Sequence, residues 1–213
     1  GNMQRRIMHI GLLVSLFATM AYPLTRLSGH EWIAYIFTLI VGYHVYEHRR
    51  ALGKFTRHAT PRSRFLRAAN YVLCAVFIIC FISGFLFSSL IPHPGREVLR
   101  YAKYVHICSS SWFYALVAMH AGFYWDSLRH TMRRVLPPLG GKWHAVLGAI
   151  SMYGLYIAVA RNFFLKMAYL YLKHPKAEPS AILFFIDYFA IFILFAYFGW
   201  WLLRFISRRP AHA

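Results

Sequence analysis

Six long runs of apolar residues constrain the fold of this 213-residue chain more than any other feature of its sequence. About 18 consecutive apolar residues are enough for a helix to cross the hydrocarbon core of a bilayer. Because backbone amides in lipid need internal hydrogen bonds, helices are the expected form of such runs. The sequence therefore predicts an all-α integral membrane bundle of about six transmembrane helices. The runs lie at residues 7–24, 30–48, 65–91, 104–125, 143–160 and 182–205.

The composition agrees with lipid as the main solvent. Hydrophobic residues make up 59% of the chain and charged residues 14%, with a mean hydropathy of +0.45. A soluble domain carries roughly 25% charged residues. A net charge of +18 could indicate nucleic-acid binding in a soluble protein. Here the Lys and Arg residues flank the apolar runs, where anionic lipid head groups attract them. We expect membrane lipids as partners and no nucleic acid.

The basic residues also predict an orientation. With both termini on one side of the membrane, that side holds the basic stretches 49–67 and 129–142, and it carries the larger share of Lys and Arg. Such residues favour the cytoplasmic side. We expect a multi-pass protein of the bacterial cytoplasmic (inner) membrane with both termini cytoplasmic. The basic and aromatic segment 161–173 is predicted to be a helix lying in the interface.

Four histidines in the second and fourth runs follow a regular scheme. His30 and His44 are 14 residues apart, and so are His106 and His120. Fourteen helical residues rise about 21 Å and turn to within about 40° of four full turns, so both imidazoles on a helix project from nearly one face. The two runs are separated by one span and should run in the same direction. His30 should therefore face His106 at an outer level, and His44 should face His120 at an inner level.

Two levels of paired imidazoles are the arrangement that two six-coordinate haems require. Ionisable groups inside membrane helices are costly, so each needs a role. We therefore predict two haem b groups, with His30 and His106 as ligands of the outer iron and His44 and His120 as ligands of the inner iron. His48 is an alternative inner ligand. Coincidental spacing among the 12 histidines is the alternative to haem binding.

This layout resembles that of b-type di-haem membrane cytochromes, which have a four-helix core with two His-x13-His helices. His-Glu-Trp at the start of the second run, Gly-Tyr-His near its end and the second His-x13-His run are similar to a family of small bacterial membrane proteins of unknown function. A looser similarity exists to ferric-reductase-like membrane domains. The resemblance covers residues 24–125 and implies the same four histidines as axial ligands. We expect a haem-binding core at 4–125, followed at 126–213 by two further transmembrane helices.

Several charged residues are candidates for accessory roles. Arginine and lysine bind carboxylates such as haem propionates, although positive-inside charge explains these basic residues equally well. The candidates are Arg26, Arg96, Arg100 and Lys103 at the outer level, and Arg49, Arg50 and Arg129 at the inner level.

Three acids are candidates for proton transfer or quinol binding, and no catalytic residue is assigned. Asp187 lies inside the last apolar run, where it could instead pair with a basic neighbour such as Arg161. Glu31 and Glu47 lie near candidate ligand histidines, and Glu31 could equally be a favourable acid in the first turn of its helix.

Two redox centres at different depths predict electron transfer across the membrane. The chain would pass electrons between a quinol, quinone or flavoprotein and a partner, as an electron-transfer subunit of an oxidoreductase system. Its cofactors would be two haem b groups and, in one variant of this hypothesis, a quinone; its partners would be a redox protein or the quinone pool. One alternative is an oxidoreductase that acts on quinone, a ferric chelate or superoxide at a haem edge. The other is a metal-binding transporter or scaffold without haem.

Overall fold

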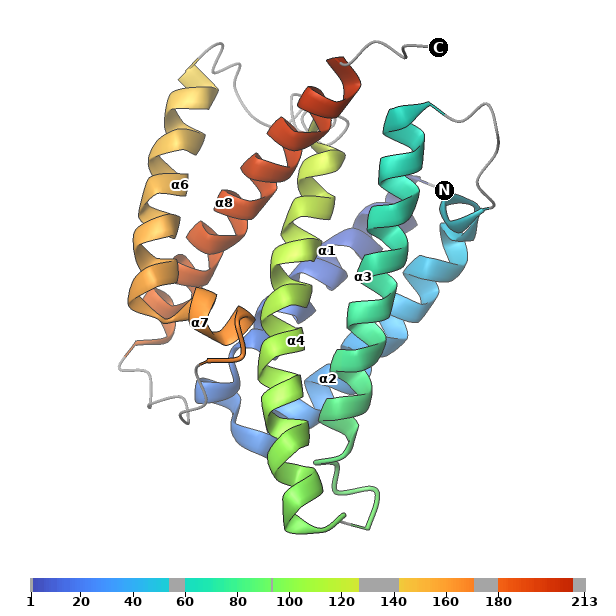
Figure 1. Cartoon of the computed structure of the whole chain (residues 1–213), viewed down its shortest axis with the longest axis vertical. Coiled ribbons are helices and arrows are strands. Elements are labelled where there is room, and N and C mark those ends of the chain that lie inside the picture. Colours follow the sequence, from blue (N-terminus) through green and yellow to red (C-terminus); the bar gives the residue numbers. More distant parts are fainter. Residues whose placement is uncertain (1, 54–59, 93, 127–141, 171–179, 209–213) are drawn as a thin grey trace. The chain divides into compact units, whose positions relative to one another are not determined.

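The computed structural model describes residues 2–53, 60–92, 94–126, 142–170 and 180–208. These residues are almost entirely helical and include no strand, which confirms the predicted all-α class (Figure 1). The helices are α1 (Asn2–Met20), α2 (Tyr22–Glu47), α3 (Pro61–Phe85), α4 (Arg96–Phe123), α6 (Lys142–Ala160), α7 (Phe163–Met167) and α8 (Ala181–Arg208), with a 3-10 turn η1 at Arg49–Leu52.

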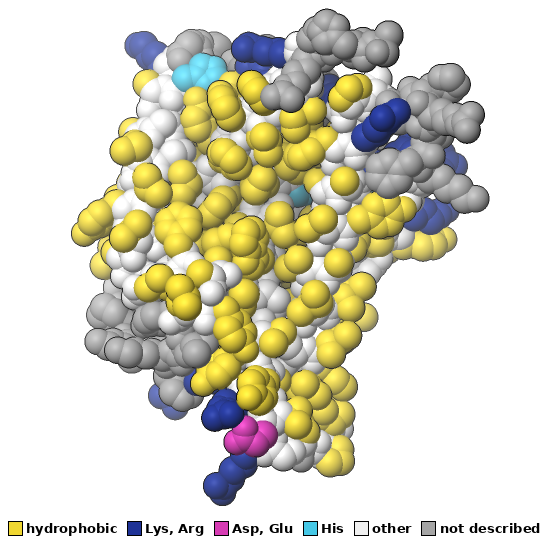
Figure 2. Space-filling model, in the orientation of Figure 1, with side chains coloured by type: hydrophobic (Ala, Val, Ile, Leu, Met, Phe, Trp, Pro, Cys, Tyr) yellow, Lys and Arg dark blue, Asp and Glu magenta, His cyan; other side chains and the backbone are white. Residues whose placement is uncertain are grey.

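Three helices are long and apolar enough to span a membrane: α3, α6 and α8. A fourth candidate span exists if α1 and α2, which are bent by 119° across their break, count as one broken span. Only 6% of the most hydrophobic stretch of α3 is buried inside the protein, so its apolar side chains need an apolar environment outside the chain. Figure 2 likewise shows hydrophobic side chains over most of the visible surface. The described helices thus provide three or four candidate membrane spans.

The first two helices differ from their predicted bounds. The predicted runs at 7–24 and 30–48 leave a gap at residues 25–29, whereas α1 ends at Met20 and α2 begins at Tyr22. Pro23 lies in the first turn of α2, where its missing N–H leaves no helical hydrogen bond unmade. The irregularity inside α2 is at Arg26, with φ 58° and ψ −172°. A residue with a side chain in this backbone conformation costs roughly 1–3 kcal/mol, so the backbone of α2 is strained at Arg26.

The other helices lie close to the predicted runs. Thr60 caps α3, because its hydroxyl accepts a hydrogen bond from the Ser63 amide at 3.2 Å. α4 begins at Arg96, before the apolar run at 104, so the charged residues that precede the run are also helical. Of the interfacial helix predicted at 161–173, α7 covers Phe163–Met167.

The chain forms two compact units. The first consists of Gly1–Gly53 and Lys173–Tyr188, and the second of Lys54–Leu172 and Phe189–Ala213. In the first unit, α1 packs against α2. In the second, α3 packs along α4, and α7 packs against α4 and α6.

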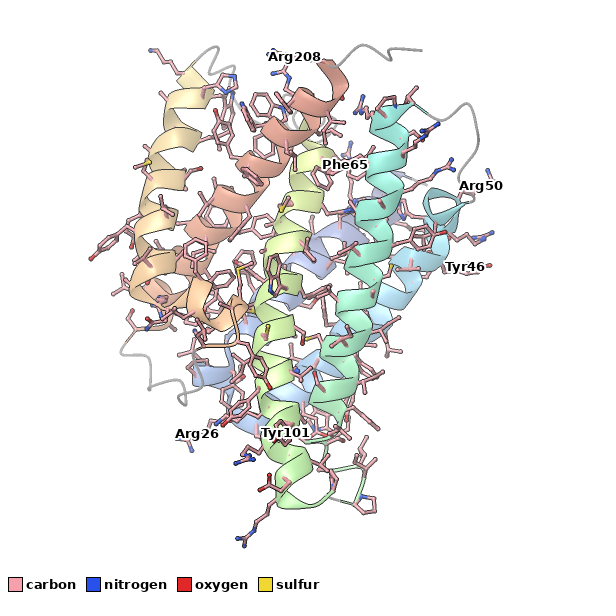
Figure 3. All side chains as sticks on the ribbon, in the orientation of Figure 1. Arg26, Tyr46, Arg50, Phe65, Tyr101 and Arg208 are labelled. Carbon is pink, nitrogen blue, oxygen red and sulfur yellow. The ribbon has the colours of Figure 1, made fainter. Side chains whose placement is uncertain are left out.

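Close helix contacts in the second unit depend on glycine. A Cβ atom at Gly122 of α4 would overlap backbone atoms of Ala196 in α8, and one at Gly154 of α6 would overlap those of Ala190. Small residues of this kind let membrane helices approach closely. Aromatic rings add to the packing, as where Phe65 of α3 meets Phe123 of α4 at 5.3 Å between ring centroids (Figure 3).

Candidate functional site

His106 of α4 is oriented by the backbone of α3. Its Nδ1 lies 2.9 Å from the carbonyl oxygen of Cys80. A carbonyl oxygen only accepts hydrogen bonds, so Nδ1 carries the proton and donates it. The hydroxyl oxygen of Ser83 lies 3.5 Å from the same nitrogen. Because Nδ1 holds the proton, Nε2 of the neutral ring keeps its lone pair and can act as a metal ligand.

Gly84 makes room for this imidazole. A Cβ atom at position 84 would lie 2.7 Å from Cε1 and 3.0 Å from Nδ1 of His106. Those separations are shorter than van der Waals contact, so any other residue would displace the ring. The glycine therefore forms a cradle on α3 in which the imidazole of His106 lies directly against the helix backbone.

His30 of α2 is held in the same way in the other unit. Its Nδ1 lies 2.9 Å from the carbonyl oxygen of Thr19 near the end of α1. The ring of Tyr22 stands edge-on to it, with 5.5 Å between ring centroids. The same reasoning assigns the proton to Nδ1 and leaves the lone pair on Nε2. The two histidines predicted to bind the outer haem thus share one tautomer, fixed in each unit by the backbone of a neighbouring helix.

This donor set fits an axial ligand of haem iron. Metal-bound histidines generally donate their second ring N–H to a carbonyl or carboxylate, which fixes the ring and raises its basicity as a ligand. His30 and His106 both have such a partner, and His106 also has the Gly84 cradle. Each is described within its own unit, so the pairing of His30 with His106 stays a prediction.

His44, one of the two predicted inner ligands, lies in a histidine cluster that the sequence pattern did not predict. His44 lies with His9 and His48 in the first unit, with ring centroids 5.6 Å and 4.6 Å from those of the two neighbours. One ligand nitrogen from each residue lies within 4.8 Å of the others. His9 belongs to α1, so no spacing within one helix relates it to His44. The packing of α1 on α2 brings it there.

His48 remains the alternative inner ligand. Its Nδ1 lies 3.0 Å from the carbonyl oxygen of His44, which assigns the proton to Nδ1 and the lone pair to Nε2. His120 of α4, the other predicted inner ligand, contacts the ring of Tyr124 at 5.1 Å. The pairing of His44 with His120 stays a prediction.

The basic residues predicted near the propionates lie mostly on the surface. Arg100 pairs with Glu97 at 2.7 Å, and the hydroxyl of Tyr101 and the charge of Glu97 raise the pKa of Arg100 above its ordinary value. Arg49 donates a hydrogen bond of 2.8 Å to the carbonyl of Tyr46. Their propionate role stays a prediction. Arg26 and Arg50 are exposed (Figure 3). Arg96 is also exposed, Lys103 is half-buried, and Arg129 lies outside the described residues.

The three candidate acids occupy different environments. Glu31 accepts a hydrogen bond of 3.0 Å from the hydroxyl of Tyr35, one helical turn away. Glu47 is exposed at the end of α2. Asp187 of α8 is buried, at 7% exposure. Carboxyl groups in all three environments can take part in proton transfer, so the roles of these acids stay predictions.

No family model, curated protein or solved structure matches the chain. The resemblance to b-type cytochromes therefore stays a prediction, and a functional proposal depends on the geometry of the histidines.

Proposed function

We propose that this protein is a di-haem b-type cytochrome that transfers electrons across a membrane. The observation that carries the proposal is that His30 and His106 make the same kind of hydrogen bond. The Nδ1 atom of each lies 2.9 Å from the backbone carbonyl oxygen of a neighbouring helix. These histidines were singled out by their sequence spacing alone, and both have the tautomer that an Nε2 ligand of iron needs.

The hydrogen bonds prepare each imidazole for ligation before any iron is bound. The hydrogen bond fixes the tautomer of the neutral ring with its proton on Nδ1, and the neutral form suits a helix in lipid because a charged group there is costly. The bond to Thr19 or Cys80 limits rotation about the side-chain torsions, so little conformational freedom is lost when a ligand binds. Gly84 removes the side chain that would displace the ring of His106.

We propose that each iron takes one imidazole from α2 and one from α4. His30 and His106 would hold the outer haem, and His44 and His120 the inner haem about 21 Å deeper. Haem, when bound, supplies the reversible one-electron chemistry of its iron, and two histidine ligands favour electron transfer over oxygen binding. The chain's own contribution is to place two such sites at two depths, between a quinol or flavoprotein on one side and an acceptor on the other.

We propose that six helical spans carry these sites in a bacterial cytoplasmic membrane, with both termini in the cytoplasm. The three or four candidate spans among the described helices support a multi-pass membrane protein. The six apolar runs of the sequence are the basis for the number of spans, and the uneven distribution of Lys and Arg is the basis for the orientation. In this arrangement α4, which carries polar and histidine residues among its apolar ones, would cross the membrane inside the bundle.

Haem content of single histidine variants tests the proposal. We expect His30→Ala and His106→Ala each to lose the outer haem, and His44→Ala and His120→Ala the inner haem, with about half of the total retained in every case. The double variant H30A/H106A should match its single variants, whereas H30A/H44A should retain none. Haem per chain is measured as the pyridine haemochrome.

The matched control is His144→Ala. His144 lies in α6, where it contacts Tyr197 and Trp200 of α8, and its removal should leave both haems in place. Size-exclusion chromatography separates haem loss from unfolding. If well-folded variants of all four ligand histidines kept the full haem content, the proposal would be wrong.

A further inference from the structure

We propose that His9, His44 and His48 form a binding site for a divalent transition-metal ion of the zinc class. The site lies within the first unit, between α1 and the end of α2. Among the residues that the structure describes, these three bring their ligand nitrogens within 4.8 Å of one another. The proposal goes beyond electron transfer, and the two proposals have one residue in common, His44.

The geometry needs only small side-chain movements to close on an ion. Zinc binds histidine nitrogen at about 2.0–2.1 Å, so tetrahedral ligand nitrogens lie about 3.4 Å apart. The rings are already 4.6, 5.6 and 6.0 Å apart, centroid to centroid. His48 is positioned by its Nδ1 bond to the His44 carbonyl at 3.0 Å, which leaves Nε2 to face an ion. Such a second hydrogen bond is the usual support of a metal-bound histidine.

The donor set selects the class of ion. Three neutral imidazoles suit zinc and its neighbours in the transition series, whereas calcium and magnesium require oxygen ligands. Three protein ligands also leave a fourth position for water or another group. The nearby Arg49 opposes a cation, but its guanidinium lies over the ring of Tyr46 at 4.4 Å and is screened by solvent at an exposed position.

Sharing of His44 has a functional consequence. This step rests on the proposed function: if zinc and the inner haem iron use the same nitrogen of His44, only one of them can bind at a time. A chain that binds the transition metal would then contain only the outer haem. Without the inner haem, electrons could not cross the membrane through the chain. The cluster is therefore a site at which a metal ion can set the haem content of the chain.

The experiment uses the full chain purified in detergent, in a His120→Ala background that leaves His44 without an inner haem under the proposed function. Zn²⁺ is titrated against a chromophoric chelator, and Co²⁺ serves as a spectroscopic probe of the ligand set. We expect one ion per chain. Adding His9→Gln or His48→Gln should weaken binding at least ~10-fold, while adding His144→Gln should change nothing.

Absence of zinc binding in the His120→Ala chain, or equal affinity in the His9→Gln and His48→Gln variants, would overturn the proposal. Retained outer haem and an unchanged circular dichroism spectrum show that these variants fold. Haem per chain in the unsubstituted protein is measured before any zinc is added, which keeps the two proposals separate. A haem-free chain that still binds zinc through His9 and His48 would reject the cytochrome and retain the metal site.

Discussion

The imidazoles of His30 and His106 depend on backbone atoms for their orientation. Their partners are the carbonyl oxygens of Thr19 and Cys80, which no side-chain substitution removes directly. Both carbonyls lie on a neighbouring helix of the same unit, so the orientation of each ring follows from how closely two helices pack. Substitutions that test the orientation of the rings should therefore be made at the residues that set the distance between the two helices.

Gly84→Ala is predicted to disturb the outer haem without removing any ligand. The added Cβ would lie 2.7 Å from Cε1 of His106, so the ring has to shift, and we expect this shift to weaken its hydrogen bond to the Cys80 carbonyl. We expect haem binding at the outer level to weaken at least ~10-fold, a typical effect of losing a metal ligand's hydrogen-bond partner. Haem titration of the purified apoprotein, followed optically, measures it.

Gly148→Ala in α6 is the matched control, because nothing lies within 4 Å of the Cβ that it adds. Its outer haem should bind as in the unsubstituted chain. Equal haem affinity in the Gly84→Ala and Gly148→Ala variants would show that the position of the His106 ring does not matter for haem.

The sequence predicts the histidine pattern but not its surroundings. The interval of 14 residues singles out His30 and His106, because it follows from the geometry of a single helix. Their carbonyl partners could not be predicted, since every residue has a carbonyl and helix packing decides which one is near. His9 was missed for the same reason: its neighbours lie on another helix.

At the scale of elements, apolar runs predict where helices lie better than where they begin. α6 and α8 match the runs at 143–160 and 182–205 closely, because hydrophobic length alone defines them. The first run, predicted to end at residue 24, is helical only as far as Met20 in α1, and the non-helical residue Arg26 lies in the predicted gap between the first two runs. Pro23 lies in the first turn of α2, where a proline is compatible with a helix.

Gly122→Ala is predicted to weaken the contact between α4 and α8. The new methyl group would overlap backbone atoms of Ala196, and overpacking of this kind costs roughly 1–3 kcal/mol. Gly148→Ala again serves as the control, with a gain of up to about 1 kcal/mol from its higher helix propensity. Reversible unfolding in mixed micelles compares the free energies of the two variants.

An unfolding free energy for the Gly122→Ala variant at or above that of the Gly148→Ala variant would contradict the close contact of α4 with α8. Haem content is a second reading on the same samples. It should change little in either variant if the packed contact is structural only.

At the scale of the whole molecule, hydrophobic length predicts an all-helical chain with about six spans. The described residues confirm the helical class and provide three or four candidate spans, among them α3, α6 and α8. Which spans lie beside one another could not be predicted in the same way. The proposed pairing of α2 with α4 would bring together helices that belong to different units, and it would depend on contacts between residues far apart in the sequence. Short-range periodicity contains no information about such contacts.

Cysteine labelling tests the predicted orientation across one span. Thr60 and Ser89 flank α3, and both are exposed. In a chain whose native cysteines are replaced by alanine, Ser89→Cys should react with a membrane-impermeant maleimide in intact spheroplasts. Thr60→Cys should react only after permeabilisation, because positive-inside charge places it in the cytoplasm.

Labelling of both positions in intact spheroplasts would contradict the crossing of α3. Labelling of Thr60→Cys alone would keep the span and reverse the orientation. The same scan at other loops would count the remaining spans.

The haem-to-chain ratio of the purified protein, together with its dithionite-reduced spectrum, tests the central claim most directly. Two bis-histidine sites predict two haem b groups per chain and the sharp α and β bands of a reduced six-coordinate b cytochrome. A folded, pigment-free protein that takes up no added haem would contradict the claim. The hydrogen bonds of His30 and His106 would then have a role other than haem binding.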